Sequence, residues 1–134
     1  MQLFHITTAA AWAAAQRAGH YRAPSLDAVG FIHLSSRSQW LATANRFYRG
    51  QRDLVLLVVR ADRLTAEVRW EDGVPPAADG APFPHLYGPL DLAAVTAAVR
   101  LTVDDDGAIR APADLADPSD PATTTSPAAR GQPG

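Results

Sequence analysis

Alternating apolar and polar residues predict two short strands in the first part of the chain. Residues 3–7, LFHIT, place three side chains on one face: Leu3, His5 and Thr7. Residues 31–35, FIHLS, repeat the alternation and place three more on one face: Phe31, His33 and Ser35. On each strand, the face that contains the histidine therefore also contains a hydroxyl group two residues later.

The first predicted helix lies between these strands. Residues 9–18 are rich in alanine, and either of the two threonines before them can cap a helix. Gly19 is suited to the position after the last helical turn. Residues 20–30 contain Pro24, so we expect this segment to be a loop.

The second predicted helix covers residues 37–49 and ends at Gly50. Ser36 and Gln39 have the spacing of a capping box, in which two side chains satisfy the free N–H groups of a helix start. The apolar residues of this helix fall on one stripe: Trp40, Leu41, Ala44, Phe47 and Tyr48. We expect this stripe to face the core.

The rest of the folded region is mostly strand. The continuous apolar run at 54–59 predicts a central strand covered on both faces. Residues 67–72 alternate as a strand, 73–82 form a loop rich in Pro, Gly and Ala, and 85–87 form a short strand. A hairpin at residues 106–107 would close the sheet. This order of elements favours an α+β fold: one compact mixed or antiparallel sheet with two main helices.

The last 24 residues differ from the rest of the chain. They contain five of the 11 prolines and no aromatic residue, and Leu115 is their only large aliphatic side chain. Such a segment buries too little apolar surface to offset the entropy of ordering it. We therefore expect a single globular domain at 1–110 and a disordered tail at 111–134.

Composition excludes several classes of function. The 134-residue chain has a formal charge of −2 and no basic stripe, which argues against bulk nucleic-acid binding. It has neither a long apolar run nor a signal-peptide pattern, so we expect no membrane contact and a cytoplasmic location. It contains no cysteine and no lysine. Thiolate and Schiff-base chemistry are therefore excluded, and phosphate groups would be held by arginine or by backbone N–H groups.

Three of the four histidines are candidates for chemistry. His5, His33 and His85 lie in three separate predicted strands, each two residues before a hydroxyl group, those of Thr7, Ser35 and Tyr87. One histidine in an apolar segment is usually a core residue, but three with the same pattern suggest a shared polar cleft. The prolines and the glycine around His85 would fix its segment rigidly.

Other chemistries have weaker support. Three histidines and a water can hold zinc, but neither H-x-H nor H-E-x-x-H occurs, so we expect no metal. The chain also lacks the G-x-S-x-G motif and a glycine-rich dinucleotide fingerprint. Glu71 is either an exposed strand end or a carboxylate at the cleft mouth that orients a hydroxyl or a histidine.

Four motifs in order carry a resemblance to a known family: FHIT, YRAPSLDAVGFIHLS, ANRFYRGQRDLVLLVV and FPHLYGPLDLAAV. Over about residues 2–101, the chain resembles the small bacterial family called domain of unknown function 952. Members of that family are similar in fold to ADP-ribosyltransferases, particularly to the RNA 2′-phosphotransferase branch that uses histidines. The resemblance therefore implies an ADP-ribosyltransferase-like fold.

The resemblance also implies NAD, or a related nucleotide, as the small-molecule partner. His5 and Thr7 match a histidine-x-threonine pattern that binds a ribose of NAD, and Phe31 or His33 matches a position that packs on the nicotinamide or ribose. The implied catalytic residues are His5, His33 and His85. The implied nucleotide-binding residues are His5, Thr7, Arg22, Phe31, Ser35, Arg46, Arg49 and Tyr87, with the three arginines as candidates for the pyrophosphate.

One departure from the family pattern leaves the activity open. The strand that carries a glutamate in many transferases carries His85 here, and a histidine cannot supply negative charge beside an oxocarbenium ion. The acceptor is then phosphorylated, or Glu71 substitutes for the missing residue, or catalysis has been lost. We expect an NAD-utilising transferase that displaces nicotinamide. The alternatives are a non-catalytic nucleotide- or metabolite-sensing module and a histidine-metal hydrolase.

Overall fold

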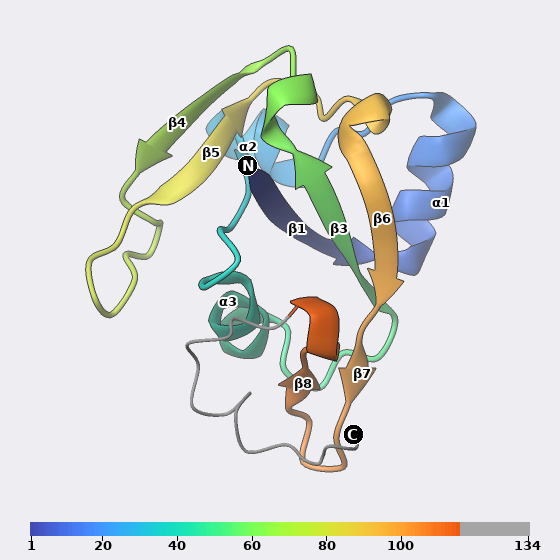
Figure 1. Ribbon diagram of the computed structural model, residues 1–134, viewed down its shortest axis with the longest axis vertical. Coiled ribbons are helices and arrows are strands. Elements are labelled where there is room, and N and C mark those ends of the chain that lie inside the picture. Colours follow the sequence, from blue (N-terminus) through green and yellow to red (C-terminus); the bar gives the residue numbers. More distant parts are fainter. Residues whose placement is uncertain (116–134) are drawn as a thin grey trace.

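The apolar run in the middle of the chain forms the centre of the first sheet. In the computed structural model, which describes residues 1–115, β3 (Leu54–Arg60) lies between β1 (Gln2–Thr8) and β6 (Val95–Arg100) and is antiparallel to both (Figure 1). The first six residues of β3 are buried because both faces of the sheet are covered. The predicted central strand is thus confirmed.

The second sheet carries two of the three candidate histidines. Its central strand, β5 (Phe83–Tyr87), pairs with β2 (Ile32–His33) and β4 (Glu67–Glu71), both antiparallel. All pairing is therefore antiparallel, but in separate sheets rather than in the single sheet expected. The strand expected at 31–35 is only two residues long, because the chain crosses from this sheet to the first.

The crossing brings the histidines of the two sheets together. After His33, the backbone leaves β5, and Ser35 forms an isolated bridge with Phe4 of β1, with two hydrogen bonds of 2.8 Å. Phe4 and Ile6 of β1 face the core cluster that contains Trp40 of α3 (Trp40–Phe47). Leu3, on the other face of β1, belongs to the second core cluster. The predicted alternation of the first strand is confirmed.

Helix α1 (Ala9–Ala18) matches its prediction closely. The Thr8 side chain accepts a hydrogen bond from the N–H of Ala11 at 3.1 Å, and Gly19 ends the helix with φ of +84°. A further helix, α2 (Pro24–Val29), lies where we expected a loop. That prediction was wrong because proline interrupts a helix only in its interior; its fixed φ and missing N–H suit the first turn, where Pro24 lies. Residues 1–115 thus contain three α-helices instead of the two expected.

Helix α3 (Trp40–Phe47) is shorter than predicted. Half of the capping box forms, because Gln39 Oε1 accepts from the N–H of Ser36 at 3.0 Å, whereas Ser36 Oγ bonds to Ser38. Trp40 and Ala44 are buried in the core, but Phe47 is 50% exposed. Including Phe47 in the apolar stripe was wrong, since the helix ends there and the side chain points away from the core.

The C-terminal part of the described chain packs against α3. Strands β7 (Thr102–Val103) and β8 (Ile109–Arg110) form the hairpin predicted at residues 106–107, but as a separate two-stranded sheet. Leu115 is buried, and its carbonyl accepts from Trp40 Nε1 at 3.1 Å. The folded region therefore extends at least to Leu115 rather than ending at 110. The remainder of the expected tail, 116–134, lies outside the described residues.

Short 3₁₀ turns complete the described chain: Ala61–Arg63, Leu92–Ala94 and Ala113–Leu115. Within residues 1–115, no helix has the length and apolar character needed to cross a bilayer.

Candidate functional site

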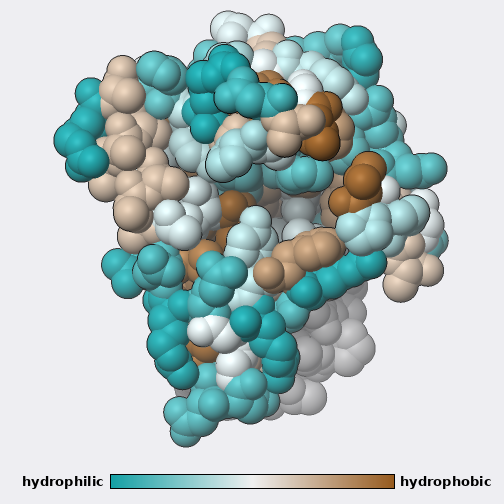
Figure 2. All heavy atoms as spheres, turned by 180° about the vertical axis from the view of Figure 1, so that it is seen from behind, coloured by the Kyte–Doolittle hydropathy of each residue, from teal (hydrophilic) through white to brown (hydrophobic). Residues whose placement is uncertain are grey.

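A large open cavity lies where the two sheets and the helices meet. Its volume is about 1170 Å³, and Figure 2 shows the recess from the side opposite to Figure 1. Its walls come from β1, α1, the chain around α2, the end of β2 and the residues after it, α3, the loop at 73–79 and β5. The loop predicted at 73–82 therefore forms part of a cavity wall.

The cavity collects seven of the ten side chains proposed from the sequence: His5, Thr7, Arg22, His33, Ser35, Arg46 and His85. The other three do not line it. The Phe31 ring lies between His85 and Tyr87, with its centroid 3.9 Å from that of His85 and 5.4 Å from that of Tyr87. Arg49 lies beside the β7–β8 hairpin, 3.6 Å from the Asp106 carboxylate.

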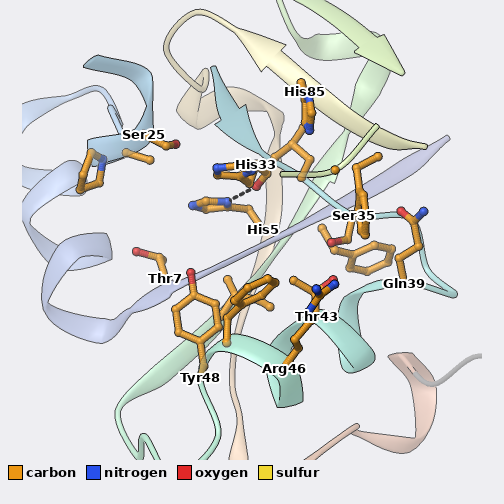
Figure 3. A pocket seen from close by; sticks show the side chains of 18 of the residues that line it. His5, Thr7, Ser25, His33, Ser35, Gln39, Thr43, Arg46, Tyr48 and His85 are labelled. Carbon is orange, nitrogen blue, oxygen red and sulfur yellow. Dashed lines mark hydrogen bonds between the residues drawn. The ribbon is translucent and has the colours of Figure 1, made fainter. Parts of the chain in front are cut away.

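His5 uses both of its ring nitrogens within the protein. Nδ1 donates to the carbonyl of His33 at 2.7 Å (Figure 3). Nε2 lies 2.8 Å from the Tyr21 hydroxyl. Burial lowers the pKa of His5 to about 4, so the ring is neutral at neutral pH. Since a carbonyl only accepts, the proton is on Nδ1, and Nε2 accepts from Tyr21. His5 thus has no ring nitrogen left for a ligand.

Tyr21 was missed by sequence analysis. Its hydroxyl also lies 3.1 Å from Thr7 Oγ1, and burial raises its pKa. Its position depends on an isolated bridge to Leu90, a contact between distant segments that no local pattern indicates. The buried group formed by Thr7, Tyr21 and His5 connects β1 to the segment before α2.

His85 has a different set of partners. Nδ1 lies 2.9 Å from Glu71 Oε1, and the Tyr87 hydroxyl donates to the same oxygen at 2.5 Å. A carboxylate has no proton to give, so Nδ1 carries the proton and donates it. These two hydrogen bonds lower the pKa of Glu71, and the carboxylate raises the pKa of Tyr87. Glu71 therefore orients a histidine, one of the two interpretations that its sequence position left open.

The second nitrogen of His85 is buried and unpartnered. The residue is only 2% exposed, and no group within residues 1–115 forms a hydrogen bond with Nε2. Phe31 stacks on the ring with an interplanar angle of 15°, and His33 stands edge-on with its centroid 5.8 Å away. The ring is thus held in one orientation at the cavity wall (Figure 3).

His33 is the exposed member of the group. Its pKa is lowered, first by the partial burial of its ring and then by the nearby His85. Its backbone carbonyl accepts from His5, and its ring nitrogens form no hydrogen bond with any group of residues 1–115. No hydrogen bond within the described chain therefore fixes the ring of His33, which lines the cavity.

The polar side of α3 forms the opposite wall. Gln39, Thr43 and Arg46 are spaced at i, i+4 and i+7, and all three line the cavity (Figure 3). This spacing could have revealed Gln39 and Thr43 from the sequence. Arg46 donates to the carbonyl of Pro76, which fixes the 73–82 loop to the helix, and Gln39 donates to the carbonyl of Pro82.

Metal binding lacks a suitable set of ligands in the described part of the chain. Residues 1–115 contain no group of three or more His, Cys, Asp or Glu side chains that could hold a metal ion. The histidine-metal hydrolase therefore has no geometric support in this region.

Comparison with known proteins places this site in a family. The family model described as "Protein of unknown function (DUF952)" matches residues 6–98. The crystal structure of protein CC0527 from Caulobacter crescentus is 38% identical, with a TM-score of 0.76, covering 86% of this chain and 98% of that one. The solution NMR structure of CC0527 is 39% identical, with a TM-score of 0.66, covering 81% and 90%. No curated protein matches. The chain belongs to the DUF952 family.

Proposed function

We propose that the chain binds NAD or a related nucleotide in the cavity and acts as a transferase at the ribose of that nucleotide. The observation that carries this proposal is the composition of the cavity, which joins an oriented imidazole, that of His85, to two arginines, Arg22 and Arg46. An ADP-ribosyltransferase-like fold, suggested by the family motifs, is part of the same proposal.

The size and surface of the cavity suit such a ligand. Small-molecule sites usually occupy roughly 300–1,000 Å³, and the volume here is about 1170 Å³. Alanines of α1 line one side, and the aromatic rings of Tyr48 and Phe83 contribute to the others. Flat apolar surfaces of this kind can hold a base or a nicotinamide ring.

Arginine can supply the phosphate contacts. Arg22 is bonded to Asp27 at 2.8 Å, and Arg46 donates to the carbonyl of Pro76 at 3.1 Å. A guanidinium has several N–H donors, so both side chains keep donors for phosphate oxygens. The Thr43 hydroxyl, on the same side of α3 as Arg46, can add a further contact.

The geometry changes the role proposed for His5. Both of its nitrogens are engaged, so we assign it to positioning the backbone of His33 and the hydroxyl of Tyr21 instead of touching a ribose. His85 is then the residue placed to move a proton, with His33 beside it. The nucleotide would supply a ribose whose anomeric carbon carries a cationic leaving group.

Thermal shift and calorimetry with NAD and ADP-ribose test the proposal. A ligand at 100 times its dissociation constant stabilises a protein by ~2.7 kcal/mol, a shift that is readily measured. Arg46→Gln should weaken binding by about tenfold or more, because it removes a charge-assisted hydrogen bond. Arg49→Gln is the matched control, since Arg49 also bonds a backbone carbonyl, that of Asp106, but lies outside the cavity. Equal affinities in the two variants, or no shift with any nucleotide, would contradict the proposal.

A second function, binding without turnover, is favoured by one feature. Among the cavity-lining residues of the described chain, the only carboxylate is the exposed Asp79, and Glu71 lies behind His85. Negative charge beside the ribose is therefore limited. Release of nicotinamide from NAD, followed by chromatography, separates the two: binding with no release identifies a sensing module.

A further inference from the structure

We infer that Glu71 is a positioning residue that fixes His85 as a hydrogen-bond acceptor toward the ligand, so that the group meeting Nε2 is a hydroxyl. This inference rests on the proposed function for the identity of the ligand. The state of His85 itself is independent of that proposal and is tested without any ligand.

The first support is the geometry of the two strands. Glu71 and His85 lie diagonally across the β4–β5 pair, in which Glu71 is opposite Phe83 and Arg69 is opposite His85. This register places the carboxylate 2.9 Å from Nδ1. The Tyr87 hydroxyl bonds the same Oε1, so the carboxylate is held from two sides. A neutral ring held in this way has its proton on Nδ1 and a lone pair on Nε2.

The second support is the fixed orientation of the ring. Phe31 stacks on it at 3.9 Å, and the residue is 98% buried, so a ring flip would have to break both the stacking and the bond to Glu71. Nε2 has no partner among residues 1–115. An acceptor that is buried without a donor is costly, and a ligand donor that reached it would remove that cost.

The lone pair on Nε2 and the fixed ring of His85 determine which group of a ligand can bind there. A lone pair accepts a hydrogen bond from a hydroxyl, whereas a phosphate oxygen without a proton would repel it. The ring of His33, exposed beside His85, can change rotamer and let a hydroxyl approach. The acceptor in the proposed transfer is therefore an alcohol rather than a phosphate.

In the proposed transfer, the ribose passes from nicotinamide to the alcohol. The proton of the alcohol passes to Nε2, and the alcohol oxygen forms a bond to the anomeric carbon of the ribose. The bond from that carbon to the nicotinamide nitrogen breaks, and its electron pair stays on the nitrogen. Glu71 does not touch the reacting atoms; it stabilises the imidazolium that forms through Nδ1–H.

The first test observes the protons of His85 directly by ¹⁵N–¹H NMR of the histidine rings at neutral pH without ligand. The wild type should show the Nδ1–H form, and Glu71→Ala should lose it. Glu71→Gln should keep it, because an amide oxygen can still accept from Nδ1. Tyr87→Phe, which removes only the second donor to Oε1, should leave it unchanged. An Nε2–H form in the wild type, or an Nδ1–H form that survives in Glu71→Ala, would overturn the inference.

The second test identifies the group that Nε2 meets. ADP-ribose should change the ¹⁵N signal of Nε2 without adding a proton to it, and inorganic sulfate, an oxyanion that carries no proton at neutral pH, should leave that signal unchanged. His85→Phe, which keeps an aromatic ring on Phe31, should weaken ADP-ribose binding by about tenfold. Protonation of Nε2 on adding sulfate would overturn the inference. If the Nδ1–H form is found but ADP-ribose does not bind, the proposed function fails and the positioning role of Glu71 stands.

Discussion

His5 and His85 are both buried histidines on the wall of one cavity, yet their surroundings differ in one decisive respect. His5 has a protein partner on each ring nitrogen, whereas among residues 1–115 His85 has a partner on Nδ1 alone. Burial therefore does not separate a structural histidine from a functional one. The two kinds of histidine differ in how many ring nitrogens already have a hydrogen-bond partner in the protein.

Acid should have the largest effect, and it should act through His5. The unfolded chain protonates this ring below about pH 6.5, but the folded protein, in which the pKa is lowered to about 4, does not. The unfolded state thus binds more protons between these values, and the free energy of unfolding falls as pH drops from 6.5 to 4. The loss for a shift of this size is about 3 kcal/mol.

Chemical denaturation at several pH values would measure this slope. His5→Phe should lose most of it, while His85→Phe should keep it. The lowered pKa of His33 adds a smaller slope of the same sign in both variants. Identical slopes in the two variants would show that His5 is not the group responsible.

Replacing each buried histidine by phenylalanine compares the two regions directly. His5→Phe removes the side-chain donor to the His33 carbonyl and leaves the Tyr21 hydroxyl with Thr7 alone, so it should cost about 2 kcal/mol of unfolding free energy. His85→Phe removes Nε2, which has no partner among residues 1–115, and also breaks the bond from Nδ1 to Glu71. Glu71 is partly exposed and keeps the Tyr87 hydroxyl, so the cost should be under ~1 kcal/mol. Urea unfolding at neutral pH measures both, and a larger loss for His85→Phe would reverse the comparison.

The two tyrosines give a second matched pair with a smaller effect. Tyr21→Phe removes both the buried donor to His5 Nε2 and the contact with Thr7 Oγ1, and it should cost about 1–2 kcal/mol because Nε2 is left buried without a donor. Tyr87→Phe removes a donor to Glu71, a partly exposed carboxylate that water can solvate, and should change stability by less than ~0.5 kcal/mol. Both are measured by the midpoint of urea unfolding. Equal losses would mean that both hydroxyl groups are structural.

His33→Ala should have the smallest effect on stability, within about 0.5 kcal/mol, because the side chain is exposed. The same variant should open the approach to His85 Nε2. In ¹⁵N NMR, exchange of the His85 Nδ1 proton with water should become faster than in the wild type. A destabilisation as large as that of His5→Phe would place His33 in the structural group.

The parts of this fold that follow from local patterns could be predicted from the sequence. Strand alternation at residues 3–7, the apolar run of β3 and the capped helix α1 depend on neighbours in the chain. Local patterns did not distinguish Arg46 from Arg49, which were both predicted to bind the nucleotide. They are three residues apart, but α3 ends at Phe47, so only Arg46 faces the cavity.

The site could be predicted only in part, because some of its contacts join segments that are far apart in the sequence. The three histidines were found because each lies in a recognisable strand. Tyr21 and the stacking of Phe31 on His85 depend on how distant segments pack. Helix α2 was missed because Pro24 has opposite effects at the first turn and in the interior of a helix.

The crossing segment at 32–35 has a mechanical consequence. Its backbone pairs with β5 through Ile32 and His33, and with β1 through Ser35, so one short stretch joins both sheets. The histidine wall of the cavity is thus stiff. The loop at 73–82 is attached to α3 through the side chains of Gln39 and Arg46 instead of by strand pairing, so it forms the more compliant wall. We expect the cavity to tolerate ligands of different length at the loop and to be strict about chemistry at the histidine end.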